Sequence, residues 1–143
     1  MKPDLEALLA LYDPAQPLEE AFTIPGPWYT DPRVHELEKP GVFGSSWQLV
    51  ARLDQLQSQG RYVTAEIAGE HVVVVRDVSG LRAFYNVCRH HATLVMSQPE
   101  GECSVMRCPY HGWTYGLDGT LKAAPDMGAG SFDKSRIGLP PVR

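Results

Sequence analysis

The sequence has only three cysteines, no excess of basic residues and no long apolar run, and each absence excludes a class of protein. Three cysteines are too few for a disulfide framework, which favours a reducing compartment. A net charge of −4 leaves no basic surface for nucleic acid. No apolar stretch reaches the roughly 20 residues that cross a membrane, and the N-terminus lacks the pattern of a signal peptide. We therefore expect a cytoplasmic protein that binds neither nucleic acid nor a membrane.

The residues that are abundant predict one domain rich in turns. A chain of 143 residues has the length of a single domain, and 43% hydrophobic residues suffice for a core. Twelve prolines and 13 glycines favour short strands and turns over long helices.

Residues 1–45 have the pattern of a helical and proline-rich leader. Residues 4–11 place leucines at helical spacing, which predicts a short amphipathic helix. The prolines of residues 13–27 predict an extended connector. Asp31 and Pro32 then predict a second helix, with the aspartate as N-cap and the proline in the first turn.

From residue 46 to residue 125 the apolar pattern has the period of β-strands. Strands are predicted at residues 47–51, 62–67, 71–76, 81–87, 93–96, 104–107, 113–115 and 121–123. Turns at residues 68–69 and 79–80 join neighbouring strands into an antiparallel meander, and residues 98–102 form a polar turn. The prediction is an all-β domain, a sandwich or small barrel of antiparallel strands, preceded by short helices. Residues 126–143 show little periodicity and resemble a passage towards another domain.

Two short clusters, Cys88-x-His90 and Cys108-x2-His111, present two thiolates and two imidazoles across 17 intervening residues. The tips of two hairpin loops can bring such clusters together around a metal. A Rieske [2Fe–2S] cluster needs this set, because two Cys hold one iron and two His hold the other. A tetrahedral zinc site uses the same four side chains, and buried residues without metal are a third interpretation. The short gap in the first cluster and the long separation favour the iron–sulfur cluster.

The chain resembles the Rieske family through Cys88, His90, Cys108 and His111. Residues 84–90 (FYNVCRH) and 108–115 (CPYHGWTY) are similar to the α subunits of Rieske-type ring-hydroxylating oxygenases. The resemblance implies a Rieske-type antiparallel fold with two cluster-binding loops and a [2Fe–2S] cofactor that relays one electron at a time.

The resemblance also implies partners and a reaction. In such oxygenases, a reductase or ferredoxin supplies electrons, and the cluster passes them to a mononuclear non-haem iron, across subunits of a trimer. The family's dioxygenases act in aromatic hydrocarbon catabolism, and similar families handle quaternary amines such as choline. This chain lacks a mononuclear iron site of its own, because only His35, His71 and His91 remain after the cluster. By itself it is therefore expected only to transfer electrons.

Two functions remain open at this point. The first is the N-terminal domain of an oxygenase α subunit, and the second is a stand-alone Rieske-type ferredoxin. The leader of about 45 residues favours the first, because such carriers normally begin near the first strand.

Four further side chains lie beside the proposed ligands. We expect Arg89 and His91 to point away from the iron, and Trp113 to shield the cluster from water. Respiratory Rieske proteins have a disulfide between the loops and a serine in place of Trp113, and both are missing here. The reduction potential is therefore expected near the low end of the family's range, roughly −150 mV.

Cys103 is expected to be a free, half-buried thiol.

Overall fold

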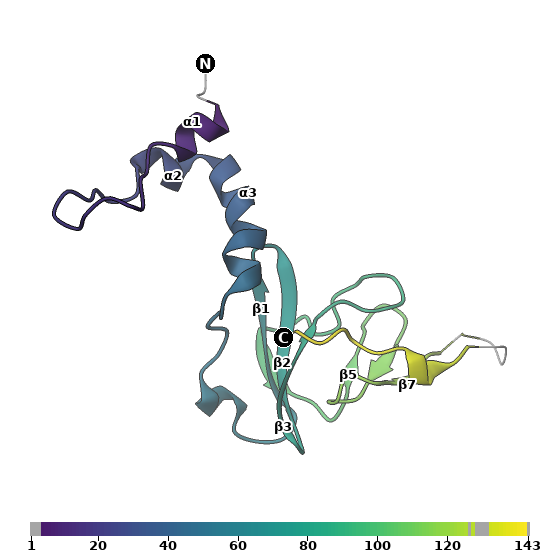
Figure 1. Ribbon diagram of the computed structural model, residues 1–143. Helices are drawn as coiled ribbons and strands as arrows, with labels where there is room; N and C mark the ends of the chain where they lie inside the picture. Colours follow the sequence, from purple (N-terminus) through teal and green to yellow (C-terminus); the bar gives the residue numbers. More distant parts are fainter. Residues whose placement is uncertain (1–3, 126, 128–131, 143) are drawn as a thin grey trace. The chain divides into compact units, whose positions relative to one another are not determined.

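A computed structural model describes residues 4–125, 127 and 132–142. The chain folds into two compact units (Figure 1). The N-terminal unit comprises residues 1–47 and the C-terminal unit comprises residues 48–143. None of the helices in the described part of the chain combines the length and the apolar character needed to cross a membrane.

The N-terminal unit consists of short helices. They are α1 (Leu5–Leu9), α2 (Gly26–Thr30), α3 (Pro32–Gly41) and the 3-10 helix η1 (Phe43–Ser45). Leu8 is buried, and Trp28 Nε1 donates a hydrogen bond to its carbonyl oxygen over 2.9 Å. The predicted start of α3 is confirmed, since Asp31 accepts from the backbone N–H of Arg33 at 3.0 Å. Helix α2 was not predicted, because the prolines of residues 13–27 indicated an extended connector. A proline in the first turn of a helix is tolerated, since the N–H that it lacks would have no partner within the helix.

The larger sheet of the C-terminal unit is the predicted antiparallel meander with one addition. Strands β1 (Arg61–Ile67), β2 (Glu70–Asp77) and β3 (Gly80–Tyr85) are joined by two tight turns. Strand β4 (Glu100–Glu102) pairs with β1 and gives the order β3-β2-β1-β4. The prediction of a polar turn at residues 98–102 is therefore wrong for residues 100–102, because pairing with a distant strand overrides local turn chemistry, while residues 98–99 form a bend.

Two predicted strands do not form. Residues 47–52 are irregular and precede the 3-10 helix η2 (Leu53–Leu56). Trp47 and Leu49 are 97% and 94% exposed, so their alternating pattern has no neighbouring strand to pack against. Residues 93–96 contribute only an isolated bridge between Leu94 and Val87.

The smaller sheet is a second antiparallel meander, in the order β5-β6-β7. Strands β5 (Met106–Arg107), β6 (Thr114–Tyr115) and β7 (Leu121–Ala123) are all short. The predicted turn between β6 and β7 is confirmed, with Gly119 in the left-handed region at a φ of 80°. The all-β class with short N-terminal helices is therefore confirmed.

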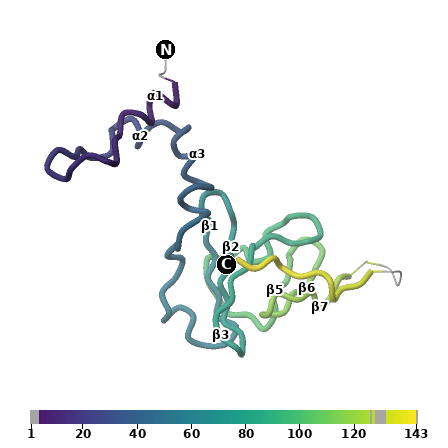
Figure 2. Tube along the Cα trace, in the orientation of Figure 1, coloured from purple at the N-terminus to yellow at the C-terminus, as the bar shows by residue number. Residues whose placement is uncertain are grey.

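The two sheets share one core and are joined by the C-terminal segment (Figure 2). Residues 132–142 contain the 3-10 helix η3 (Lys134–Arg136) and then form bridges from Gly138 to Thr120 and from Pro141 to Phe84. The described residues of this segment thus connect both sheets, and the passage towards another domain stays a prediction. Residues 126, 128–131 and 143 lie outside the described part.

We predict that Gly119→Ala destabilises the fold more than Gly69→Ala. Both glycines have positive φ, which costs a residue with a Cβ about 1 kcal/mol. A Cβ on Gly119 would also overlap the ring of Phe84, whereas nothing lies within 4 Å of a Cβ on Gly69. Overpacking adds roughly 1–3 kcal/mol. Urea denaturation of both variants measures the difference, and equal losses of unfolding free energy would contradict the predicted overlap.

Candidate metal centre

The two Cys/His clusters lie in two loops with the same backbone frame. The first loop (residues 86–96) follows β3, and the second loop (residues 108–113) connects β5 to β6. In the first, Cys88 N donates to Thr93 O at 2.8 Å and Ala92 N donates to Cys88 O at 3.0 Å.

The second loop repeats this pattern at the same offsets. Cys108 N donates to Trp113 O at 2.8 Å, and Gly112 N donates to Cys108 O at 3.1 Å. Each loop therefore closes on its own cysteine and holds that cysteine and its histidine in one short turn.

The fourth position after each cysteine has left-handed backbone. Gly112 has a φ of 73° and Ala92 a φ of 56°. A left-handed conformation costs a residue with a Cβ about 1–2 kcal/mol, so Ala92 stores local strain beside the site. The hydrogen bonds at both ends of the turn hold it in place.

Asn86 fixes the base of the first loop. It is 2% exposed, and its side chain donates to Met96 O at 2.8 Å and accepts from Met96 N at 2.9 Å. These two bonds join the start of the loop to its end. Sequence analysis missed this role, because it depends on a partner ten residues away rather than on a local pattern.

The two thiols are buried beside one another, with Cys88 and Cys108 each 3% exposed. Burial raises the pKa of the Cys108 thiol, and the Cys88 side chain raises it further. Backbone N–H groups of Tyr110 and His111 act in the opposite direction, because they stabilise the thiolate. A metal ion would deprotonate both sulfurs, and these N–H groups are placed to support the resulting charge.

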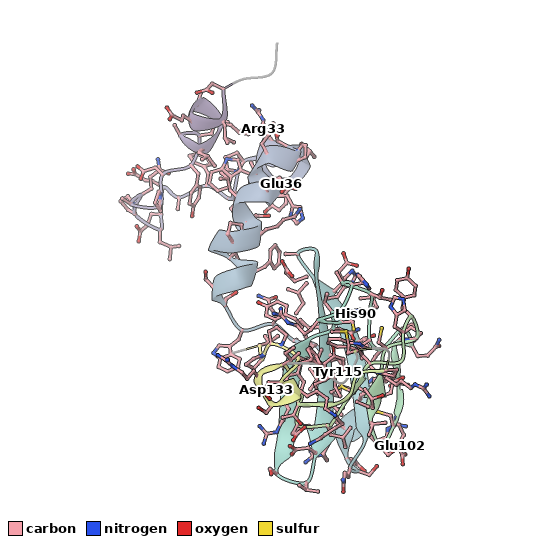
Figure 3. The ribbon with its side chains drawn as sticks, turned by 90° about the vertical axis from the view of Figure 1, so that its right-hand side faces the viewer. Arg33, Glu36, His90, Glu102, Tyr115 and Asp133 are labelled. Carbon is pink, nitrogen blue, oxygen red and sulfur yellow. The ribbon has the colours of Figure 1, made fainter. Side chains whose placement is uncertain are left out.

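Tyr115 on β6 is fully buried in the C-terminal unit (Figure 3) and contacts the first thiol. Its hydroxyl lies 3.3 Å from Cys88 Sγ and accepts from Arg89 N at 3.0 Å. Burial raises the pKa of this phenol far above its ordinary value, so the hydroxyl keeps its proton. Since it already accepts from Arg89, its proton is free to donate to sulfur. The sequence indicated only a strand residue at this position.

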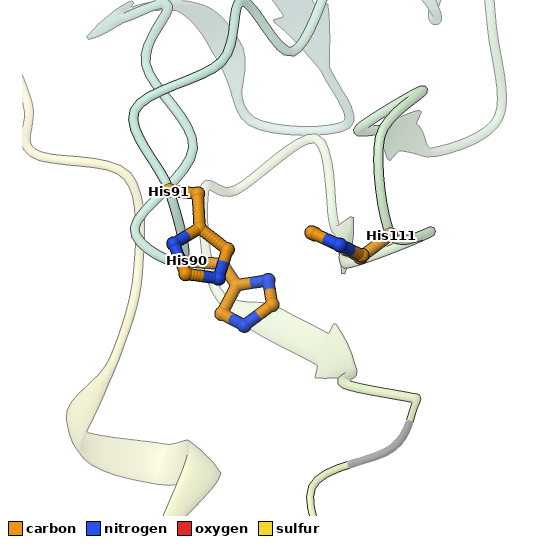
Figure 4. Close-up of side chains that lie close together, drawn as sticks. All are labelled: His90, His91 and His111. Atoms are coloured by element: carbon orange, nitrogen blue, oxygen red, sulfur yellow. The ribbon is translucent and has the colours of Figure 1, made fainter.

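Three imidazoles gather at the tips of the loops (Figure 4). Ring nitrogens of His90, His91 and His111 lie within 4.8 Å of one another. The ring of His91 is exposed, but its centre lies only 3.9 Å from that of His90, so the expectation that His91 points away from the iron stays a prediction. Among the described residues this is the one grouping of at least three His, Cys, Asp or Glu ligand atoms, and it includes no carboxylate.

His90 has the properties of a metal ligand. Its Nδ1 is buried and has no hydrogen-bond partner among the residues that the structure describes. Burial lowers the pKa of His90, and the neighbouring imidazoles lower it further. A neutral imidazole with a free, buried nitrogen is the state that binds a metal.

Aromatic rings flank the imidazoles on both sides. Trp113 is 3% exposed and stacks on His90, with ring centres 4.8 Å apart and planes 5° from parallel. Tyr110 stacks on His111 at 3.9 Å and is 63% exposed. The imidazole pair thus has a buried side and an open side.

The remaining candidate residues lie outside this cluster. Cys103 is a free, partly buried thiol, as expected, and burial raises its pKa. His35 lies near Glu38, with Nδ1 3.5 Å from a carboxylate oxygen, and His71 lies 3.8 Å from Glu66.

The sequence matches a known family and curated relatives. The family described as Rieske [2Fe-2S] domain matches residues 46–139. The chain is 42% identical over 142 residues to a chloroplastic choline monooxygenase of Arabidopsis thaliana, covering 98% of this chain and 33% of that protein. It is 43% identical over 127 residues to the carnitine monooxygenase oxygenase subunit of Escherichia coli strain K12, covering 87% and 34%. The chain thus spans about a third of the length of these relatives.

Solved structures of two kinds share the fold. The quaternary ammonium Rieske monooxygenase CntA in complex with L-carnitine has a TM-score of 0.78 and 38% identity, covering 86% of this chain and 36% of that one. Naphthalene 1,2-dioxygenase from Rhodococcus sp. bound to indole has a TM-score of 0.77 and 36% identity, covering 83% and 28%.

We predict that Asn86→Ala lowers the free energy of unfolding by about 2 kcal/mol, because it leaves two backbone groups of Met96 unpaired. The matched control is Thr64→Val, which removes an exposed hydrogen bond from Thr64 Oγ1 to Gln98 O. The control should change stability by less than about 0.5 kcal/mol. Thermal denaturation compares the two, and equal effects would show that the Asn86 contacts do not fix the first loop.

Proposed function

This chain belongs to the Rieske [2Fe-2S] domain family and binds a [2Fe–2S] cluster, and we propose that it is the electron-transfer domain of an oxygenase. The coverage of its relatives supports this, since the similarity extends over nearly the whole chain but over only a third of each oxygenase. The alternative of a stand-alone ferredoxin has no such support among these relatives.

We propose that Cys88 and Cys108 hold one iron and that His90 and His111 hold the other. Two adjacent buried thiols match the thiolate end of the cluster, and the unpartnered Nδ1 of His90 matches the imidazole end. The thiols and imidazoles of the two loops therefore fit a [2Fe–2S] cluster. His91 is close enough to compete, but its exposed ring belongs to the open side of the site.

When bound, the cluster accepts and releases one electron at a time. The residues around the cluster stabilise its charge and determine which side of it is open to solvent. Tyr115 and the N–H groups of the second loop stabilise charge on the sulfurs. Trp113 keeps water from the buried side, while the open side with Tyr110 leaves His111 near the surface.

We propose that a reductase or ferredoxin supplies the electrons and that the acceptor is a mononuclear non-haem iron outside this chain. Transfer to an iron of another subunit is supported by one structural relative, a quaternary ammonium Rieske monooxygenase with inter-subunit electron transfer. A homotrimer is the proposed assembly, in which one subunit's cluster serves a neighbour's iron. A reducing compartment such as the cytoplasm suits the free thiol, although some relatives are chloroplastic.

For the complete protein we propose monooxygenation of a quaternary ammonium compound. The named substrates of its relatives, choline, carnitine and glycine betaine, share a quaternary ammonium group. The dioxygenase and aromatic hydrocarbon functions inferred from the sequence are the second candidate, supported by the likeness to naphthalene 1,2-dioxygenase.

The experiment that tests the proposal is the intact mass of the native protein, followed by substrate oxidation. A mass well above 15.8 kDa, with oxidation of choline, carnitine or betaine, is expected. A mass equal to 15.8 kDa would overturn the oxygenase assignment in favour of a ferredoxin. Oxidation of naphthalene but of none of the ammonium compounds would favour the second candidate.

We predict that Cys108→Ser and His111→Ala abolish the visible absorption of the cluster, because each removes one ligand of an iron. The matched controls Cys103→Ser and His91→Ala remove a thiol and an imidazole outside the proposed set and should keep the absorption. Iron content and visible spectra of the purified variants measure the outcome. Full absorption in either ligand variant would refute the assignment.

We predict that Tyr115→Phe lowers the reduction potential by roughly 40 mV, since a hydrogen bond worth about 1 kcal/mol more to the reduced cluster is lost. Tyr85→Phe is the matched control, because Tyr85 lies on β3 and is 37% exposed, whereas the hydroxyl that contacts Cys88 Sγ belongs to Tyr115. Redox titration followed by visible spectra gives both potentials. A potential unchanged in Tyr115→Phe would show that the phenol does not donate to Cys88.

A further inference from the structure

Two buried side-chain nitrogens lack a hydrogen-bond partner among the described residues, and they belong to neighbouring rings. They are His90 Nδ1 and Trp113 Nε1. The two rings are stacked, with centres 4.8 Å apart and planes only 5° from parallel. Buried polar groups in folded proteins nearly always have hydrogen-bond or metal partners. Because these two nitrogens lie in one ring stack, we infer that one bound group satisfies both.

Trp113 differs in this respect from the other two tryptophans of the chain. Trp28 donates its Nε1 proton to Leu8 O at 2.9 Å, and Trp47 is 97% exposed. Trp113 is 3% exposed and packs against His90 and Phe132, so its N–H is shielded from bulk water. Leaving such a donor unpaired costs about 1–3 kcal/mol.

The chemistry of the two nitrogens defines the missing group. A neutral imidazole nitrogen offers a lone pair to iron, whereas an indole N–H can only donate a proton to an acceptor. The acceptor is not a cysteine ligand, because Nε1 makes no bond to Cys88 or Cys108. The remaining acceptors that a [2Fe–2S] cluster brings are its inorganic sulfides.

We propose that Trp113 Nε1–H donates a hydrogen bond to an inorganic sulfide of the cluster, while its ring holds His90 in the orientation that binds iron. The inference rests on the proposed ligand assignment and adds a residue to it. Trp113 is thus a positioning residue that also stabilises the reduced cluster, because the added electron increases negative charge on sulfur. Tyr115 acts differently, through the thiolate of Cys88.

Pulsed EPR of the reduced protein with tryptophan labelled by ¹⁵N in the indole ring tests the hydrogen bond directly. The label is absent from histidine and backbone, so coupling of ¹⁵N to the cluster spin can arise only from tryptophan. We expect coupling in the wild type and in Trp28→Phe, and none in Trp113→Phe. A normal Rieske signal without ¹⁵N coupling in the wild type would overturn the inference while leaving the ligand assignment intact.

The reduction potential gives a second readout at one fixed pH. Trp113→Phe keeps an aromatic ring against His90 but removes the N–H, so roughly a tenfold shift of the redox equilibrium towards the oxidised form is expected, about 59 mV for one electron. Trp28→Phe should leave the potential unchanged. An unchanged potential in a cluster-loaded Trp113→Phe would overturn the inference. If the wild-type protein shows no Rieske EPR signal at all, the ligand assignment is overturned, and this inference with it.

Discussion

The backbone hydrogen bonds that close each loop on its own cysteine are the constraint on which the site depends. Cys88 and Cys108 each donate to a carbonyl five residues ahead and each accept from an N–H four residues ahead. This repeated frame aims both thiols into the core and leaves both imidazoles at the tips. The two halves of the proposed ligand set therefore meet as thiols on one side and imidazoles on the other, which is the asymmetry of a Rieske cluster.

The rest of the C-terminal unit keeps these loops in place. Asn86 joins the two ends of the first loop, and Tyr115 reaches from β6 to Cys88 and so ties the smaller sheet to that loop. The segment around Gly138 and Pro141 bridges both sheets. A metal site whose ligands come from two loops needs such support, because a shift of either loop would separate the ligands.

Sequence alone predicted what depends on local chemistry. Turn residues and alternating valines predicted the meander β1-β2-β3, and spacing predicted the Cys/His loops. What depends on distant contacts was missed. β4 exists because β1 offers it an edge, while residues 47–51 have the strand pattern without a neighbour. Tyr115 carries no local signal of its contact with Cys88, and the close approach of the His90 and His91 rings was likewise not predicted from their adjacent positions.

In the proposed site, two cysteines hold one iron and two histidines hold the other. Mössbauer spectroscopy of the ⁵⁷Fe-enriched native protein tests this assignment, because it distinguishes the two irons. We predict two inequivalent sites in the oxidised protein and, after one-electron reduction, a ferrous site with the parameters of mixed nitrogen and sulfide ligation. Two equivalent, fully sulfur-ligated irons, or a protein that contains zinc and no iron, would contradict this ligand assignment.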